Sequence, residues 1–169
     1  MIWHKKNPFK VSFFLWRLLK HKVAVDLNLG KFGINIPSMC SCCISHKEES
    51  EEHLFFDSMI GNNNWKYFNQ VFGISSGPAN LRHLMITWWL TKGKNDIQKI
   101  ALQILPGIIV WQVWKARCKS RFENVKMHHN RIIPQICQQL IIIIHKQIPR
   151  IPPLLDWEVF QKVMEFAKE

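Results

Sequence analysis

The sequence predicts a mainly α-helical protein, and three observations support this fold class. Apolar residues recur at spacings of three and four positions through several segments, which places them on one face of a helix. Residues that favour helix ends, chiefly Asn, Asp, Ser and Gly, flank these segments. No segment alternates apolar and polar residues as a half-buried strand does. Apolar residues make up 47% of the 169 positions, so a substantial core can form.

Two helices are predicted before the cysteine-rich segment. The first covers 9–23, with Pro8 beside its first turn, where proline is tolerated because the N–H it lacks would have no partner within the helix. Its apolar side chains follow helical spacing and comprise Val11, Phe14, Leu15, Leu18 and Leu19. The second begins at Asp26, a good capping residue, and ends near Lys31, where Gly30 favours a stop.

A third helix is expected after the cysteine-rich segment. Ser50 can cap it, and Glu51 and Glu52 in its first turn suit the positive end of the helix dipole. We expect Gly61 and the asparagines after it to end this helix, and a separate helix to cover 64–72.

The rest of the chain is predicted to hold further helices after a turn-rich linker at 74–80 (ISSGPAN). These helices are expected at 81–90, from Asn95 or Asp96 to about Phe122, at about 130–147, and from Asp156 onward. The linker is the main predicted boundary. The resulting division is a small helical domain at 1–74, a helical extension at 75–147, and a proline-rich linker with a terminal helix at 148–169.

The charge balance favours a polyanionic partner. Lysine and arginine number 23 against 12 aspartates and glutamates, which gives a formal net charge of +11. A chain this basic suits nucleic acid or an anionic membrane surface. No run approaches the ~20 apolar residues of a membrane span, so we expect no membrane-spanning segment. Of the two polyanionic partners we favour nucleic acid and expect no membrane partner.

The cysteines indicate a reducing compartment. There are five, an odd number, and Cys42 and Cys43 are adjacent, which suits a disulfide framework poorly. The first residues are polar and basic, without the apolar region of a secretory signal. We therefore expect an intracellular protein, nuclear or cytoplasmic.

Two thiols and an imidazole have the spacing of a small zinc site. Cys40 and Cys43 stand in a C-x-x-C turn, and His53 follows on the third predicted helix. For the fourth ligand we favour Asp57, because residues four apart share one face of an α-helix and a carboxylate oxygen is an accepted zinc ligand. The alternatives for that position are Cys42, His46 and water. If the site binds no metal, the cysteines would be small buried thiols.

Basic residues concentrate in two segments, 1–31 and 115–131, which could form one face that binds the phosphates of RNA or DNA. The residues predicted to make these contacts are Lys5, Lys6, Lys10, Arg17, Lys20, Lys22, Lys115, Arg117, Lys119 and Arg121. Trp3 is the aromatic residue that we expect to stack on bases, since it stands beside basic residues. Trp111 and Trp114 lie at helical spacing among isoleucines and are expected in the core.

Four segments form an ordered pattern along the chain. They are PFKVSFFLWRLL at 8–19, the C-x-x-C of Cys40 and Cys43, EHLFF at 52–56, and WQVWKARCKSRF at 111–122. This pattern resembles the zinc-binding domain at the C-terminal side of plant LINE-type (non-LTR) retrotransposon reverse transcriptases, over roughly residues 1–125. The resemblance implies a zinc site in which Ser58, a poor zinc ligand, replaces the last cysteine of the family.

The residues predict a protein without catalytic activity. The single tyrosine, Tyr67, is not part of the Y-x-D-D motif of a polymerase, and no three carboxylates are arranged as a ribonuclease H needs. A solvated loop and helix cap are expected from Glu48, Glu49, Glu51 and Glu52. We expect a non-catalytic domain that binds RNA or DNA. The alternatives are a protein-interaction module, which would pack against a polymerase domain or another protein, and a degenerate transposon fragment.

Overall fold

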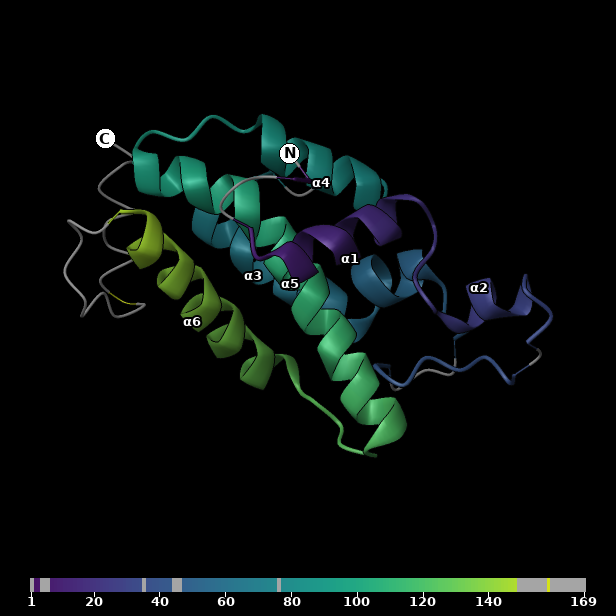
Figure 1. Cartoon of the computed structure of the whole chain (residues 1–169). Coiled ribbons are helices and arrows are strands. Elements are labelled where there is room, and N and C mark those ends of the chain that lie inside the picture. Colours follow the sequence, from purple (N-terminus) through teal and green to yellow (C-terminus); the bar gives the residue numbers. More distant parts are fainter. Residues whose placement is uncertain are drawn as a thin grey trace.

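The computed structural model describes residues 2–3, 7–34, 36–43, 47–75, 77–148 and 158. These residues are mainly α-helical, as predicted, and contain no strand. The elements in chain order are α1 (Phe9–Leu19), α2 (Asp26–Gly30), the π-helical turn η1 (His53–Asp57), α3 (Met59–Phe72), α4 (Leu81–Leu90), α5 (Asp96–Phe122) and α6 (His129–Gln147) (Figure 1). The predicted linker and terminal helix at 148–169 lie outside the described residues, apart from positions 148 and 158.

The longest helix, α5, forms the centre of the fold and runs beside α6 through the molecule (Figure 1). It packs against α1, η1, α3, α4 and α6, and its middle part, 104–110, is buried. Gly107 lets α1 come close, since a Cβ at this position would lie 3.2 Å from Cγ1 of Val11. Among the described residues, only α5 is long and apolar enough to span a membrane. However, 72% of its most apolar 18-residue stretch is buried inside the protein, as in a core helix.

One hydrophobic core serves both sides of the predicted boundary at 74/75. Buried side chains from the two sides, such as Phe55 and Trp88, belong to a single cluster. The first part of the chain therefore shares its core with the helices that follow. The division of the chain into domains at this boundary stays a prediction.

Helix α1 ends at Leu19, earlier than the apolar pattern predicts. His21 has a backbone φ of +54°, in the left-handed region, where the helix cannot continue. Side chains then satisfy the free carbonyl groups: Arg17 donates to the carbonyl of Lys22 at 3.1 and 2.8 Å, and Asn28 Nδ2 donates to that of His21 at 3.2 Å. The helix thus ends where contacts with α2 become available. The spacing of apolar residues along the helix does not indicate these contacts.

The predicted break at Gly61 is wrong, because α3 runs from Met59 through Gly61 and the asparagines at 62–64. Ser58 begins this helix, and its hydroxyl accepts the N–H of Gly61 at 2.9 Å. A Cβ on Gly61 would lie 2.8 Å from the carbonyl oxygen of Phe55. The glycine therefore permits α3 to pack closely against η1.

Candidate metal centre

A closed turn carries the two cysteines of the predicted metal site. The N–H of Cys40 donates to the carbonyl of Lys47 at 2.9 Å, which closes the turn. The hydroxyl of Ser120, on α5, donates to the carbonyl of Ser41 at 3.2 Å and so ties the turn to the long helix. Cys40 is buried and Cys43 is half-buried, so one thiol lies near the surface.

His53 lies at the start of η1, in an unusual local structure. The hydroxyl of Ser50 accepts the N–H of His53 at 3.0 Å, so Ser50 has the capping role that we predicted. The N–H of Ser58 donates to the carbonyl of His53 at 2.6 Å, five residues back, which makes the turn π-helical. Single π-helical turns are rare and are found frequently at functional sites.

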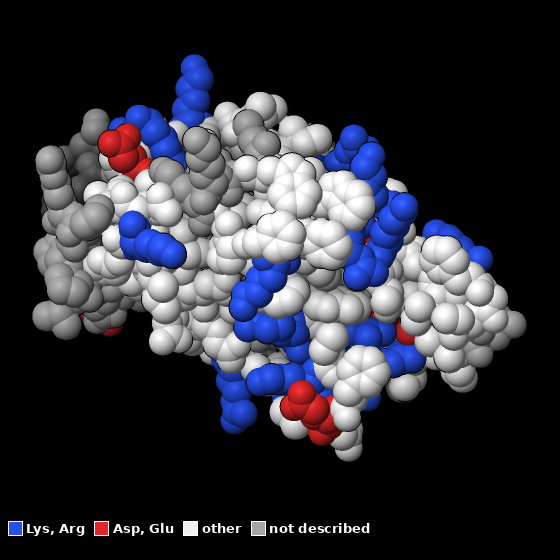
Figure 2. Space-filling model, in the orientation of Figure 1, with Lys and Arg blue, Asp and Glu red and all other residues white. Residues whose placement is uncertain are grey.

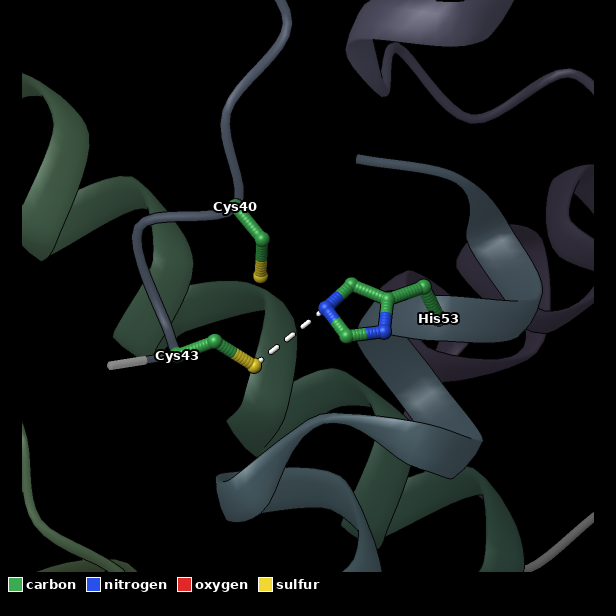
Figure 3. A group of neighbouring side chains, drawn as sticks. All are labelled: Cys40, Cys43 and His53. Carbon is green, nitrogen blue, oxygen red and sulfur yellow. Dashed lines mark hydrogen bonds between the residues drawn. The ribbon is translucent and has the colours of Figure 1, made fainter. Parts of the chain in front are cut away.

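The side chains of Cys40, Cys43 and His53 converge (Figure 3). Each offers one ligand atom, and these atoms all lie within 4.8 Å of one another. Cys43 Sγ lies 3.2 Å from Nε2 of His53. Zinc bonds of ~2.3 Å to sulfur and ~2.0 Å to nitrogen would place these two atoms about 3.5 Å apart in a tetrahedral site. Cys43 and His53 therefore need only a small separation to hold a zinc ion, and we call the three residues the metal group.

The surroundings of the metal group favour neutral side chains unless a cation is bound. Burial lowers the pKa of His53, which keeps its imidazole in the form that binds metals. A hydrogen bond with Cys42, together with burial, raises the pKa of Cys40. Burial also raises the pKa of Cys43, although the N–H of Met59 at the start of α3 favours its thiolate. A bound cation would supply the charge that the two thiolates need.

Among the described His, Cys, Asp and Glu residues, none adds a fourth ligand to the metal group. Asp57, the predicted ligand, is exposed and lines a separate pocket with Lys66. That prediction assumed α-helical geometry, whereas the turn that carries Asp57 is π-helical. Cys42 is buried and also lies outside the metal group, and His46 lies outside the described residues.

Ser58, where the resemblance places a cysteine, has a structural role. It is fully buried, and its hydroxyl donates to the carbonyl of Leu54 at 2.7 Å and accepts the N–H of Gly61 at 2.9 Å. These bonds close η1 and cap α3. Because the hydroxyl is already engaged in both roles, it is not free to act as the fourth ligand.

Two acidic residues that were predicted to be solvated are buried instead. Glu49 is fully buried, and Arg117 reaches its carboxylate with Nη2 at 2.7 Å and Nε at 3.1 Å. Glu51 is 8% exposed and accepts the N–H of Val23 at 3.0 Å. The expectation of a solvated acidic loop is therefore wrong for Glu49 and Glu51. Glu48 and Glu52 are exposed, as expected.

Arg117 is not part of a nucleic-acid-binding surface, which corrects the prediction for this residue. Its side chain is 3% exposed and also lies 3.4 Å from Asp26. Arg121, which is 25% exposed, donates to the same Asp26 at 2.8 Å. We call Asp26, Glu49, Arg117 and Arg121 the buried ion network. Its partners are 68 to 95 positions apart in the sequence, so no local pattern indicates them.

Three of the lysines predicted to bind phosphate lie together on α1 and α5. Lys10 and Lys119 are exposed, and Lys115 is half-buried. Burial lowers the pKa of Lys115, and the charges of Lys10 and Lys119 lower it further. Within the described part of the chain, none of these lysines forms an ion pair. We call Lys10, Lys115 and Lys119 the basic cluster; Figure 2 shows the face on which Lys and Arg side chains gather around α1 and α5.

The other predicted phosphate-binding residues have different surroundings. Arg17, Lys20 and Lys22 are exposed at or beyond the C-terminal end of α1. The guanidinium of Arg17 is already engaged by the carbonyl of Lys22. Lys5 and Lys6 lie outside the described residues.

The tryptophans fall into exposed and packed groups. Trp3 is 56% exposed. Trp111 and Trp114 are half-buried, and their ring centroids lie 5.4 and 5.6 Å from that of Phe14, so they pack against the core as expected. Lys10 Nζ lies 5.9 Å from the ring centroid of Trp111, which places the basic cluster beside these rings.

Comparison with known proteins supports the metal site. Residues 1–65 match the family described as zinc-binding in reverse transcriptase. The match includes all three residues of the metal group, so zinc is the metal that this group suits. No curated protein and no solved structure matches the chain.

Proposed function

We propose that this chain is a non-catalytic nucleic-acid-binding protein derived from a plant LINE-type (non-LTR) retrotransposon reverse transcriptase. The basic cluster is the observation that carries the proposal. Its three lysines lie close together and, among the described residues, have no acidic partner. The phosphates of RNA or DNA would relieve their mutual repulsion. The match of 1–65 supports an origin in a reverse transcriptase, and the LINE-type and plant assignments rest on the sequence resemblance.

Zinc has a structural role in this proposal. Cys40, Cys43 and His53 would hold it, and at such sites metal binding contributes free energy of folding. The segment that carries the cysteines is tied to α5 through the bond from Ser120 and through the buried ion network. The basic cluster lies partly on the same half of α5, so an ordered metal site would help to hold this surface.

The acidic residues near the metal group support a non-catalytic role. Glu49 belongs to the buried ion network, and Glu51 accepts a backbone N–H from the connection between α1 and α2. Glu52 accepts the N–H of Leu81 at 2.7 Å. Since these carboxylates have structural partners, none of the three is a ready general base for metal-assisted hydrolysis.

We also infer an intracellular location, nuclear or cytoplasmic. All five cysteines are unpaired thiols. Reducing compartments keep thiols in this state, and nucleic acids occur in the same compartments.

A protein-interaction module is the second candidate function. Large apolar side chains at the surface favour it, since Phe32 is 77% exposed and Leu90 is 71% exposed. Such a module would pack against a polymerase domain or another protein. Self-association without salt-dependent binding of nucleic acid would support this function in place of the first.

The experiment that tests the proposal compares two lysine variants of equal charge. One replaces Lys10, Lys115 and Lys119 by Gln; the other replaces Lys92, Lys94 and Lys146, which are exposed elsewhere. Binding of a labelled 20-nucleotide RNA is measured by fluorescence anisotropy at several salt concentrations. If each lysine contacts one phosphate, the first variant should lower the slope of log affinity against log salt by about 2 to 3. Equal losses in both variants, or no binding by the wild type, would reject the proposal.

A further inference from the structure

Four aromatic side chains form a continuous row along the outer face of α1. They are Trp3, Phe9, Phe13 and Trp16, and we call them the aromatic ladder. Successive ring centroids are 6.2, 6.1 and 5.7 Å apart, and the ring planes differ by 36°, 15° and 26°. The last three members are spaced so that they lie on one face of the helix.

The aromatic ladder is not required to build the core. The opposite face of α1 packs against the protein through buried side chains that include Val11, Leu15 and Leu18. Three of its four rings remain exposed, Phe9 by 74%, Trp3 by 56% and Phe13 by 43%, and Trp16 is half-buried. A helix that keeps several large rings in water, while its core face is fully packed, is typical of a binding surface.

The charges around the ladder select a negatively charged partner. Lys10 stands next to Phe9 in the helix and belongs to the basic cluster, which continues onto α5. Lys20 follows Trp16 by four positions and is exposed. No Asp or Glu occurs before Asp26, which is itself buried in the ion network. Figure 2 shows Lys and Arg on two sides of the ring-shaped side chains that lie over α1.

The spacing of the rings favours a single strand over a duplex. Centroids about 6 Å apart exceed the ~3.4 Å rise between stacked bases of one strand in a duplex. Neighbouring rings can therefore meet neighbouring bases only where the strand is extended and its bases are unstacked. Flat rings with phosphate-binding lysines beside them are how proteins bind single strands without sequence preference.

We propose that the aromatic ladder is a base-stacking platform for single-stranded RNA or DNA, with the basic cluster binding the phosphates beside it. This inference rests on the proposed nucleic-acid binding and deepens it, because it names the strand state of the ligand and the residues that contact its bases. Trp3, which was predicted to stack alone, becomes one end of a longer surface. A protein partner would also bury this apolar face, but it would give no preference for a single strand over a duplex.

The test uses three probes of equal length: a labelled 20-nucleotide RNA, the same RNA in a duplex, and a 20-residue abasic strand. One variant carries Phe9→Ala and Phe13→Ala. The control carries Phe32→Ala, an aromatic residue outside the ladder that is about as exposed as Phe9. The double variant should bind the single strand about 10- to 100-fold more weakly. Its binding of the duplex and of the abasic strand, and its salt slope, should stay as in the wild type.

The outcomes separate this inference from the proposed function. If the double variant binds the single strand like the wild type, while the Gln variant of the basic cluster binds all probes more weakly, the ladder inference fails and the proposed function stands. If the wild type binds no probe, both fail. A Phe9→Leu/Phe13→Leu variant keeps apolar area without flat rings. Binding restored by leucine would show that stacking is not the interaction and would overturn the inference.

Discussion

Lys115 and Arg117 are two positions apart on α5, yet their surroundings are opposite. Arg117 is buried and bonded to Glu49 and Asp26, whereas Lys115 lies near the surface between two other lysines. Their sequence neighbourhood predicts the same role for both. The difference arises because the helix turns Arg117 toward the acidic groups of a distant segment and turns Lys115, which is half-buried, toward Lys10 and Lys119. A basic segment thus holds a structural side and a side that is available to a ligand.

The largest expected effect comes from replacing Arg117, the buried residue of this pair. Arg117→Met would leave the carboxylates of Glu49 and Asp26 in the interior without their main partner. The free energy of unfolding should fall by about 3–5 kcal/mol, as measured by urea denaturation. The matched change Lys115→Met should alter it by no more than about 0.5 kcal/mol. Similar losses in both variants would contradict the assigned difference between the two positions.

Removing zinc tests whether the buried ion network holds the cysteine turn by itself. Zinc at about 100 times its dissociation constant should raise the free energy of unfolding by about 2.7 kcal/mol, with a higher melting temperature that a chelator reverses. Cys40→Ser/Cys43→Ser should abolish this response. Cys118→Ser, which lies outside the metal group, should keep it. An unchanged melting temperature in the wild type on adding zinc or chelator would count against the site.

Ser58→Cys tests a second buried polar residue, which like Arg117 is held by structural hydrogen bonds. The thiol is a weaker cap than the hydroxyl, so the metal-free variant should lose about 1 kcal/mol of stability. Its zinc affinity should rise, because a third thiolate completes the ligand set that the family resemblance implies. Titration with Co²⁺, monitored by the thiolate-to-cobalt absorption, checks this expectation. Weaker metal binding than in the wild type would show that position 58 cannot reach the ion.

The smallest effect on stability is expected at Lys115, the residue of the pair that lies near the surface. Lys115→Gln should leave the unfolding transition within about 0.5 kcal/mol of the wild type. It should lower the salt slope of RNA binding by about 0.7 to 0.9, the contribution of one phosphate contact. Lys94→Gln, an exposed change outside the basic cluster, should leave the slope unchanged. The two slopes are compared by anisotropy at four salt concentrations.

Local patterns predicted the parts of the fold that local interactions decide. The bounds of α4 and α5 follow the predicted ones closely, because each has an asparagine cap and an apolar face. The side chain of Asn95, for example, accepts the N–H of Gln98 at 2.8 Å. Gly61 shows where such reasoning fails. A glycine that resembles a helix stop permits close packing between α3 and η1, and only the positions of both elements reveal this.

For the candidate site, the sequence by itself determined the metal group. Cys40, Cys43 and His53 are close in the chain, so their spacing and chemistry were enough to predict a zinc site. Only the tertiary structure decided that Asp57 lies apart from the metal group, that Glu49 and Arg117 neutralise each other, and that the rings of α1 form a row beside the basic cluster. The physical reason is that burial and long-range pairing depend on which surfaces meet, and residues 68 positions apart carry no local sign of their contact.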